Sequence, residues 1–357
     1  MDIYVLNKNN EVIDVIDTYK SAIWDLKYNE RGECELYIAA DQKAVTLLAI
    51  GNRLARDKDI MPDGSMYHVM TINKIQLTTD DEEGDNLIIT GYDLKDILRQ
   101  RIVWQQTNLS GSVEADIEKL VDENAIKPSI PARQIDGFML KLPGIYTQKH
   151  QQQITGDNLY DTVVDILQTY QAGWDVYIDA ANNYVMTLYA GTDRSINQDT
   201  NPHIVFSAGN ENITDDTYSV DYTNYKTTVV VAGEGEGLNR RRSVVGGSAK
   251  GLERYEGYTD SRNVSSNDGE ISEKEYTALL VSDGKDYISE NSYVENYEGS
   301  IETNGMYIYN TDYFLGDVVT VANKYGITAN PRILRVIESV SDEGETVIPS
   351  LSTWIGE

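Results

Sequence analysis

The sequence has very few of the residues that usually carry covalent or metal chemistry. It contains one cysteine, Cys34, and three histidines in 357 residues. A single cysteine excludes an intramolecular disulfide framework and any multi-thiolate metal site. No apolar run approaches the ~20 residues that a membrane helix needs, and the first residues lack the basic region and apolar stretch of a signal peptide. We therefore expect a soluble protein made in a cytoplasm, without Sec-type export and without a membrane partner.

Basic residues are also scarce. The chain has 30 Lys+Arg against 58 Asp+Glu, a formal net charge of −28. This balance argues against binding to nucleic acid or anionic lipid through neutralised phosphates, because counterion release needs clustered cations. The 40% of hydrophobic residues is enough for packed cores, and 357 residues predict about two to three structural units. The 25 tyrosines, against 3 phenylalanines, suit half-buried strands and broad polar interfaces.

The residues that could carry catalysis do not form a recognisable set. His68, His150 and His203 lie far apart and show no metal-ligand spacing, and no G-x-S-x-G motif is present. Cys34 lies between Glu33 and Glu35, and neighbouring carboxylates raise the pKa of a thiol. We therefore predict no catalytic residue, no cofactor, no cofactor-binding residue and no metal ligand, and expect that the protein is not an enzyme.

Three further segments could suggest a ligand site, and each has a simpler interpretation. Gly233–Gly237 follows a predicted strand, but it contains two carboxylates and no Lys-Ser/Thr follows, which favours a glycine-rich turn. The acidic turn Asp80–Asp85 could hold Ca²⁺, but its spacing does not match an EF-hand loop, so a solvated hairpin tip is favoured. Arg240–Arg242 is the only basic run and is interpreted as an inter-subunit salt-bridge partner or a solvated face.

Hydrophobic periodicity divides the chain into three regions. Short alternating runs with turn signals, and a hairpin around the Asp80–Asp85 turn, predict a small β-barrel or sandwich over residues 1–105. Residues 106–200 combine helical and strand patterns and are predicted to form an α+β unit. Residues 201–357 are predicted to be β-rich with one helix, and 218–232 reads as a single long strand.

Three helices are predicted from their caps and apolar faces. Ser112 is placed as the N-cap of the first, and Asp157 as the N-cap of the second, which Gly173 would end. Ser272 and Glu275 form a capping box that would open the third helix. Gly284 lies inside this last helix and weakens it by roughly 1 kcal/mol relative to alanine.

One arrangement of elements occurs twice. A Gly-polar opening at 51–56 leads to a crossing strand, an Asp-Glu-Glu-Gly turn and a return strand. The same order recurs from 316–321 through 331–340 and 341–344 to 345–348. This repeat predicts two related barrel halves or two related β-domains. The alternative that an antiparallel protein simply reuses hairpins stays open.

Five segments, in order along the chain, resemble one family. Residues 21–38, with Trp24, Tyr28 and Gly-Glu-Cys-Glu-Leu, resemble the opening of the siphophage baseplate-hub family, the Gp37-like tail proteins of phages that infect Gram-positive bacteria. Cys34 replaces the usual phenylalanine of that motif. The other matching segments are 87–102, 231–237, 253–262 and 313–321.

The resemblance implies a mainly β protein with an α+β insertion. It would have two related tube-like β-barrel domains, the second at about 306–357, assembling as a ring, as in the hubs of contractile tails and type VI spike proteins. It further implies a structural homotrimer at the tail tip or baseplate of the virion that adapts a six-fold tube to a three-fold tip. Its expected partners are the tail tube or distal tail protein, the tape-measure protein, and tip, spike or fibre proteins, with DNA passing through the lumen without specific binding.

Two alternatives remain open from the residues. A surface glycan-binding module would bring Trp24, Trp104, Trp174 and Trp354 together as aromatic platforms, whereas a hub would scatter them. An acidic-pair glycoside hydrolase would place two carboxyls about 5 to 10 Å apart in a cleft, one of them with a raised pKa. The net charge also suggests an acidic channel wall, which would repel the DNA backbone.

Overall fold

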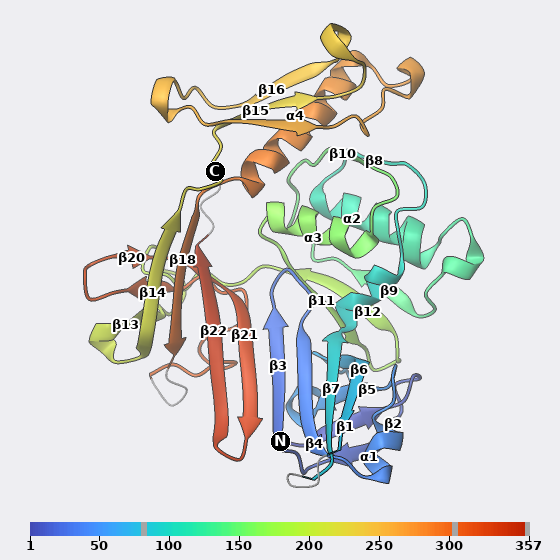
Figure 1. Ribbon diagram of the computed structural model, residues 1–357, viewed down its shortest axis with the longest axis vertical. Coiled ribbons are helices and arrows are strands. Elements are labelled where there is room, and N and C mark those ends of the chain that lie inside the picture. Colours follow the sequence, from blue (N-terminus) through green and yellow to red (C-terminus); the bar gives the residue numbers. More distant parts are fainter. Residues whose placement is uncertain (80–83, 302–305, 354–357) are drawn as a thin grey trace.

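The computed structural model describes residues 1–79, 84–301 and 306–353 (Figure 1). Its α-helices are α1 (Gln42–Leu47), α2 (Val113–Val121), α3 (Leu159–Thr169) and α4 (Glu273–Glu290). The strands of its largest sheet are β1 (Ile3–Leu6), β2 (Val12–Ile16), β3 (Ser21–Lys27), β4 (Glu33–Ala39), β5 (Arg53–Arg56), β6 (Met70–Thr78), β7 (Asn86–Asp93), β14 (Ile213–Asp221), β18 (Val294–Ile301), β21 (Arg332–Ser341) and β22 (Gly344–Thr353). The smaller sheets contain β8 (Thr107–Leu109), β9 (Phe138–Lys141), β10 (Gln152–Ile154), β11 (Gly173–Ile178), β12 (Tyr184–Tyr189), β13 (Val205–Ser207), β15 (Thr228–Ala232), β16 (Arg242–Gly246), β17 (Glu256–Asp260), β19 (Thr320–Ala322) and β20 (Thr328–Ala329).

One sheet joins the two ends of the chain. Its strands are hydrogen-bonded in the order β14-β18-β22-β21-β3-β4-β7-β6-β5-β1-β2, and it runs across the lower part of Figure 1. The molecule is mainly β with helices added, as predicted. No sheet of the described residues closes on itself, so a barrel would need strands from more than one chain.

The eight strands from β14 to β6 form two groups of four with the same connectivity. In β3-β4-β7-β6 and in β14-β18-β22-β21, the sheet order runs first, second, fourth and third strand along the chain. The third strand of each group carries a register shift near its start, between Ile72 and Lys74 in β6 and between Ile333 and Arg335 in β21. This shared order supports the duplication expected from the sequence.

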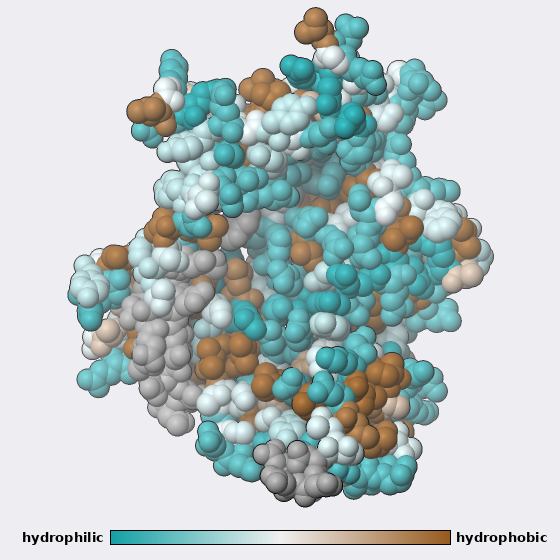
Figure 2. Space-filling model, in the orientation of Figure 1, coloured by the Kyte–Doolittle hydropathy of each residue, from teal (hydrophilic) through white to brown (hydrophobic). Residues whose placement is uncertain are grey.

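Each group has its own hydrophobic core. Trp24, Leu36 and Ile89 are fully buried under the first group, and Phe206, Val321 and Ile333 under the second. Apolar residues alternate with polar ones along β3 and β4, which is the pattern of strands buried on one face. In Figure 2, exposed apolar residues gather at the lower right, where Figure 1 places α1, β1 and β2.

Residues between the two groups form an α+β unit of α2, α3 and the sheet β11-β12-β9. Ser112 caps α2, as predicted, by accepting a hydrogen bond from the Ala115 amide. The prediction for α3 was one residue off, because Asn158 rather than Asp157 caps it. Gly173 begins β11 instead of ending the helix, whose chain reversal uses Gln171 at a positive φ of 51°.

The last third contains a separate lobe, drawn at the top of Figure 1, in which α4 covers the sheet β16-β15-β17. The predicted long strand 218–232 was wrong, because β14 ends at Asp221 and β15 begins at Thr228 in another sheet. The capping box of Ser272 and Glu275 is confirmed. The boundaries expected at 105/106 and 200/201 stay predictions.

Candidate functional site at the seam between the two strand groups

The two groups of four strands meet where β21 pairs with β3, and we call this pairing the seam. Its register runs from Arg335 opposite Lys27 to Ser341 opposite Ser21. On one face of the seam, Arg335 Nε and Nη2 donate to the two oxygens of Asp25 at 2.7 and 2.9 Å. Because both N–H groups of the fork are used, this is the stronger, orientation-specific type of ion pair. The seam is therefore held by side chains as well as by backbone.

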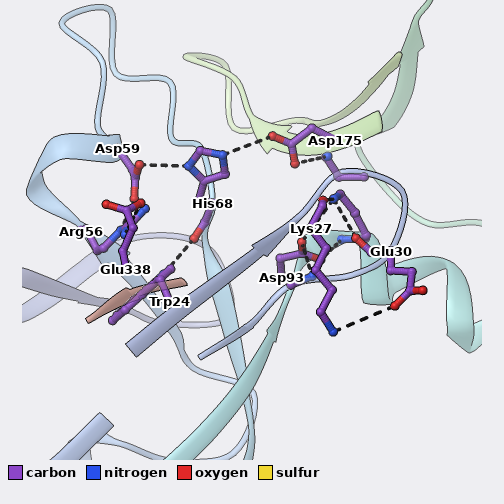
Figure 3. A network of polar contacts seen from close by, with 12 residues as sticks. Trp24, Lys27, Glu30, Arg56, Asp59, His68, Asp93, Asp175 and Glu338 are labelled. Atoms are coloured by element: carbon purple, nitrogen blue, oxygen red, sulfur yellow. Dashed lines mark hydrogen bonds and ion pairs between the residues drawn. The ribbon is translucent and has the colours of Figure 1, made fainter. Parts of the chain in front are cut away.

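The other face of the seam holds a buried ion cluster (Figure 3). Arg56 of β5 is 1% exposed and donates from Nη1 to Glu338 Oε1 of β21 at 3.0 Å and from Nε to Asp59. Lys58 also pairs with Glu338. Burial alone would lower the pKa of Arg56, but the charges of Asp59 and Glu338 outweigh it and raise that pKa. A buried guanidinium with two carboxylate partners is stable only while both remain.

His68 extends this cluster to the α+β unit. Its Nδ1 lies 3.0 Å from Asp59 Oδ1, and its Nε2 lies 3.9 Å from Asp175 Oδ2 in β11. Burial alone would lower the pKa of His68 and raise that of Asp59. The hydrogen bond between the two side chains outweighs burial and raises the pKa of His68. Together with Arg56, the same hydrogen bond lowers the pKa of Asp59 to about 2. The Trp24 indole donates to the carbonyl oxygen of His68 at 3.3 Å. His68 thus links the segment of Asp59 that follows β5, strand β11 of the α+β unit and strand β3.

Tyr28, just after β3, is a second point where three parts meet. Its side chain is fully buried, and its amide donates to Leu334 O at 2.9 Å. A Cβ built on Gly173 would lie 2.1 Å from the Tyr28 ring, and one built on Gly316 would lie 2.4 Å from it. The hydroxyl lies 3.2 Å from Tyr189 O. Only glycine permits this approach of three backbones to one ring.

The face of the eight strands that carries Asp25 has a mixed charge. In the strand register, Asp25 lies directly opposite Glu33 and Arg335 directly opposite Lys27, so opposite charges meet diagonally: Lys27 Nζ lies 3.8 Å from Asp25 and 3.7 Å from Glu33. Its charged residues include Asp25, Glu33, Glu35, Lys27, Lys74 and Arg335, and the registers of the second group also place Asp221 and Arg332 on it. This face therefore carries charges of both signs, and the acidic channel wall stays a prediction.

A cavity of about 560 Å³ opens beside the upper end of β3. It is lined by strand ends of the seam and by the end of α3, including Lys27, Glu30, Gln168, Asn330 and Arg332. Lys27 Nζ lies within 4.0 Å of Asp25, Glu30 and Glu33, and Arg335 pairs with Asp25, so the cavity is lined by paired charges.

Carboxyls with raised pKa values occur elsewhere, between α3 and α4. Burial and neighbouring carboxylates, Glu290 among them, raise the pKa of Asp165 and of Asp286 to about 6 each. A glycosidase needs one acid and one base, whose environments push the two pKa values apart. Here both groups shift together, so the pair does not show the division of roles that hydrolysis requires.

The remaining candidates from the sequence occupy structural positions. His150 is 3% exposed and contacts Asp116 Oδ2 through Nδ1 at 3.0 Å, whereas His203 is exposed. Burial, more than the neighbouring glutamates, raises the pKa of the Cys34 thiol to about 12. Within the described residues, no group of three or more His, Cys, Asp or Glu side chains is arranged to hold a metal ion. Residues 80–83 of the proposed Ca²⁺ turn lie outside the described ranges.

The glycine-rich and basic segments belong to the lobe. A Cβ on Gly233 would lie 2.2 Å from the Tyr276 hydroxyl, so this turn packs against α4. Arg240 pairs with Asp260, and Arg241 pairs with Glu234 and Glu273, all within the chain. The expectation of an inter-subunit salt bridge therefore applies only to Arg242, which is exposed.

The three tryptophans that the structure describes do not share one groove. Trp24 and Trp174 are fully buried, Trp104 is 50% exposed and Trp354 lies outside the described residues. This scatter is what a hub would show, and it gives a glycan platform no support. No helix of the described residues has the length and apolar character to cross a membrane.

The family model described as "Siphovirus ReqiPepy6 Gp37-like protein" matches residues 2–351. The chain belongs to this Gp37-like family. It is a structural phage tail protein of the siphovirus type, as the sequence resemblance indicated. A search of curated proteins found no match.

Solved structures show the same fold at low identity. The 43 kDa tail protein of prophage MuSo2 from Shewanella oneidensis is 12% identical, with a TM-score of 0.61, covering 98% of each chain. The tail protein from Neisseria meningitidis MC58 is 14% identical, with a TM-score of 0.58, covering 99% of this chain and 97% of that one. A Francisella PdpA-VgrG complex chain is 12% identical, with a TM-score of 0.52, covering 99% of this chain and 52% of that one. The Gp37-like chain therefore shares its fold with phage tail proteins and with a chain of the PdpA-VgrG complex.

Proposed function

We propose that this Gp37-like chain is the baseplate hub at the distal end of a phage tail tube and acts as a homotrimer. The observation that carries the proposal is the pair of equivalent four-strand groups within one sheet. Three chains would supply six such groups, so a three-fold ring could match a six-fold tube above it and a three-fold tip below it. On this view, each group stands in for one tube subunit.

Two open strand edges support assembly into a ring. Among the described strands, β14 is the last of its sheet, and β18 is the strand paired with it. On β6, β5 covers only Met70 and Thr71, and within the described ranges the outer edge of residues 74–78 has no strand partner. Unpaired edges of this length readily add another strand. Pairing β6 of one copy with β14 of the next would repeat the seam between chains.

The seam also suggests which residues would face one another. When β6 and β21 are aligned on their register shifts, Lys74 of β6 corresponds to Arg335 of β21. Gln76 then corresponds to Ile337, which lies opposite Asp25 of β3. If β14 takes the place of β3, Gln76 falls opposite the middle or end of β14, within residues 217–221. This correspondence makes the proposed contact specific enough to test.

The proposed location and partners follow from the ring. The tail tube or distal tail protein would stack on one rim, and a tip, spike or fibre protein would bind the other. The tape-measure protein and DNA would pass through the lumen. The mixed charge of the Asp25 face, without a cluster of unpaired cations, would let a phosphate backbone pass without tight binding.

Cysteine cross-linking tests the proposal directly, because the one native cysteine, Cys34, is buried. Gln76→Cys is combined in turn with Thr217→Cys, Ser219→Cys and Asp221→Cys in the full chain, and the products are separated on a denaturing gel. We expect one combination to give a covalent trimer of three times 40.1 kDa. Gln76→Cys with Leu238→Cys, on the lobe, is the matched control and should give none.

Light scattering over a concentration series gives an independent measure of assembly. A mass near three times 40.1 kDa supports the ring. Dimers linked by any of the β6–β14 combinations without trimers would contradict it. If the free chain is monomeric, the same cysteine pairs are tested in assembled tails, and absence of a cross-linked trimer there overturns the proposal.

A further inference from the structure

A small pocket on the α+β unit has the composition of a protein-binding hot spot. It has a volume of about 290 Å³ and is formed by the chain after β7 and by the segment around the short helix η4 (Pro131–Arg133). Trp104 is 50% exposed, Ile102 40% and Ile130 39%. Arginine and tryptophan are the residues most enriched where binding energy concentrates. The pocket also contains Gln100, Arg101, Ala132 and Arg133.

The two arginines of the pocket lack the partners that arginines usually have in this acidic chain. Arg101 Nε donates to Arg133 O at 2.6 Å, and Arg133 Nη2 donates to Ile102 O at 2.7 Å. Arg133 Nη1 is buried and has no hydrogen-bond acceptor among the described residues. Neither guanidinium forms an ion pair with a described carboxylate, although Arg31, Arg99 and most of the other arginines do.

The two guanidinium groups of the pocket lie close enough to influence each other's charge. Burial, together with the charge of Arg101, lowers the pKa of Arg133. A carboxylate in the pocket would offset the repulsion between the two cations. The geometry thus favours an anion in this place.

The apolar half of the pocket restricts which anion fits. Ile102, Ile130 and the Trp104 ring adjoin the arginines, and Arg133 lies over that ring at 4.9 Å from its centroid. One ring face is therefore covered, which leaves its edge and the isoleucines for an aliphatic or aromatic side chain. A DNA strand would carry many charges toward a protein of net charge −28, and long-range repulsion disfavours it. A peptide with one or two carboxylates meets little of that repulsion.

We propose that this pocket binds an acidic, apolar peptide segment of another protein, in which a carboxylate lies next to a large apolar side chain. The carboxylate accepts hydrogen bonds from Arg101 and Arg133, and the apolar side chain packs on Ile102, Ile130 and Trp104. In Figure 1 the α+β unit lies on the opposite side of the molecule from β14, and neither edge used for the proposed ring contributes to the pocket. The inference therefore holds whether or not the chain forms a trimer.

The test uses the full chain labelled with 5-fluorotryptophan, with the Trp104 signal assigned by Trp104→Phe. The probe is an acetylated, amidated octapeptide with a central Asp-Phe pair in a Gly-Ser background. We expect it to shift the Trp104 signal in a saturable way at millimolar or lower concentration. Asp→Asn or Phe→Ala in the peptide should each weaken binding about tenfold, as expected for loss of a charge-assisted hydrogen bond or an apolar anchor.

Variants of the protein separate binding from folding. Arg133→Gln should weaken peptide binding about tenfold, and Arg133→Lys should lie between it and the native chain. Arg242→Gln, which removes an exposed arginine of the lobe, is the matched control and should bind normally. If every variant folds, equal peptide binding by the native chain and both Arg133 variants would overturn the proposal.

Three other outcomes would also overturn it. The first is equal binding of the Asp-Phe and Asn-Phe peptides, or no Trp104 shift with any peptide. The second is a stronger shift with a six-thymidine oligonucleotide, which would make the site a nucleic-acid contact. The third is a Trp104 shift that depends on protein concentration without peptide, which would assign the pocket to a second copy of this chain.

Discussion

The two four-strand groups share one strand order but differ in what lies between their strands. In the first group, β3 and β4 are joined by a short turn, residues 28–32. In the second, the corresponding strands β14 and β18 are separated by residues 222–293, which form the lobe with α4. The sheet is thus the common part, and the insertions distinguish the groups. A duplicated unit can keep its pairing surface while its connections take on separate contacts.

The groups also differ in how their edges are covered. Strands β5, β1 and β2 follow β6 in the first group, whereas β13, β19 and β20 form a separate sheet beside the second. The seam is the place where both groups depend on each other: Arg335 of the second binds Asp25 of the first, and Arg56 of the adjoining strand β5 binds Glu338 of the second. Changes at the seam should therefore have larger effects than changes in either insertion.

The largest effect is expected from Glu338→Ala. It leaves Arg56, which is 1% exposed, without its partner across the seam. Removing one member of a buried pair costs about 3–5 kcal/mol. Chemical denaturation, with hydrogen exchange of β3 and β21, measures the loss. Glu345→Ala is the control, because Glu345 also contacts Lys58 but is 57% exposed; equal losses for the two variants would show that the buried cluster does not hold the groups together.

A smaller loss is expected where the groups meet at Tyr28. Gly316→Ala combines a positive φ of 95° with a Cβ 2.4 Å from the Tyr28 ring, and we expect a cost of about 2–4 kcal/mol. Gly326→Ala has a similar φ of 84° but open space around the Cβ, so it should cost only about 1 kcal/mol. Thermal unfolding of both variants isolates the contribution of the ring contact. Identical unfolding temperatures for the two variants would mean that the Tyr28 ring can move aside without loss of stability.

The pH dependence of the seam is expected to be weaker still. Because the folded-state pKa of His68 is raised, its charged pair with Asp59 contributes stability that is fully present below the unfolded value of ~6.5. That stability is lost as pH rises through the folded value. The difference in unfolding free energy between the native chain and His68→Gln should therefore shrink above pH ~6.5. A difference that grows with pH would refute the ion pair.

The smallest effect should stay within the lobe. Ser272→Ala removes the capping box of α4, at a cost of about 1 kcal/mol. Hydrogen exchange should speed up in α4 and β15 while β3 and β21 keep their protection. Gly284→Ala offers a contrast, because its Cβ would lie 2.5 Å from Val245 on the covered sheet, although alanine favours helix. If Ser272→Ala also loosened the seam, the lobe and sheet would form one cooperative unit.

Local features were predictable from the sequence, and long-range ones were not. The Ser112 cap, the Ser272 capping box and the β6–β7 hairpin depend on residues close in the chain, and all are present. The break between β14 and β15 was missed because residues 222–227 continue the aromatic and β-branched run without glycine or proline. Such a run has strand propensity whether or not the chain turns.

The contacts of the seam had no signature in the sequence at all. Arg335 and Asp25 are 310 residues apart, and each alone looks like an ordinary exposed charge. The internal repeat and the family resemblance both supplied the expectation of paired β-domains, and the structure adds which strands join them. The Arg101–Arg133 pocket was likewise missed, since only folding brings Trp104 and Ile130 together.

The distance along the chain between β3 and β21 also bears on synthesis. β3 is among the first strands to leave the ribosome, but its partner β21 is among the last. At the elongation rates of ~5–20 residues per second, the β3 edge stays unpaired for many seconds after β4 and β7 have folded beside it. A nascent chain therefore exposes the kind of edge that invites premature association. Pairing of β21 with β3 is the step that removes this edge, and it cannot occur until nearly the whole chain has been made.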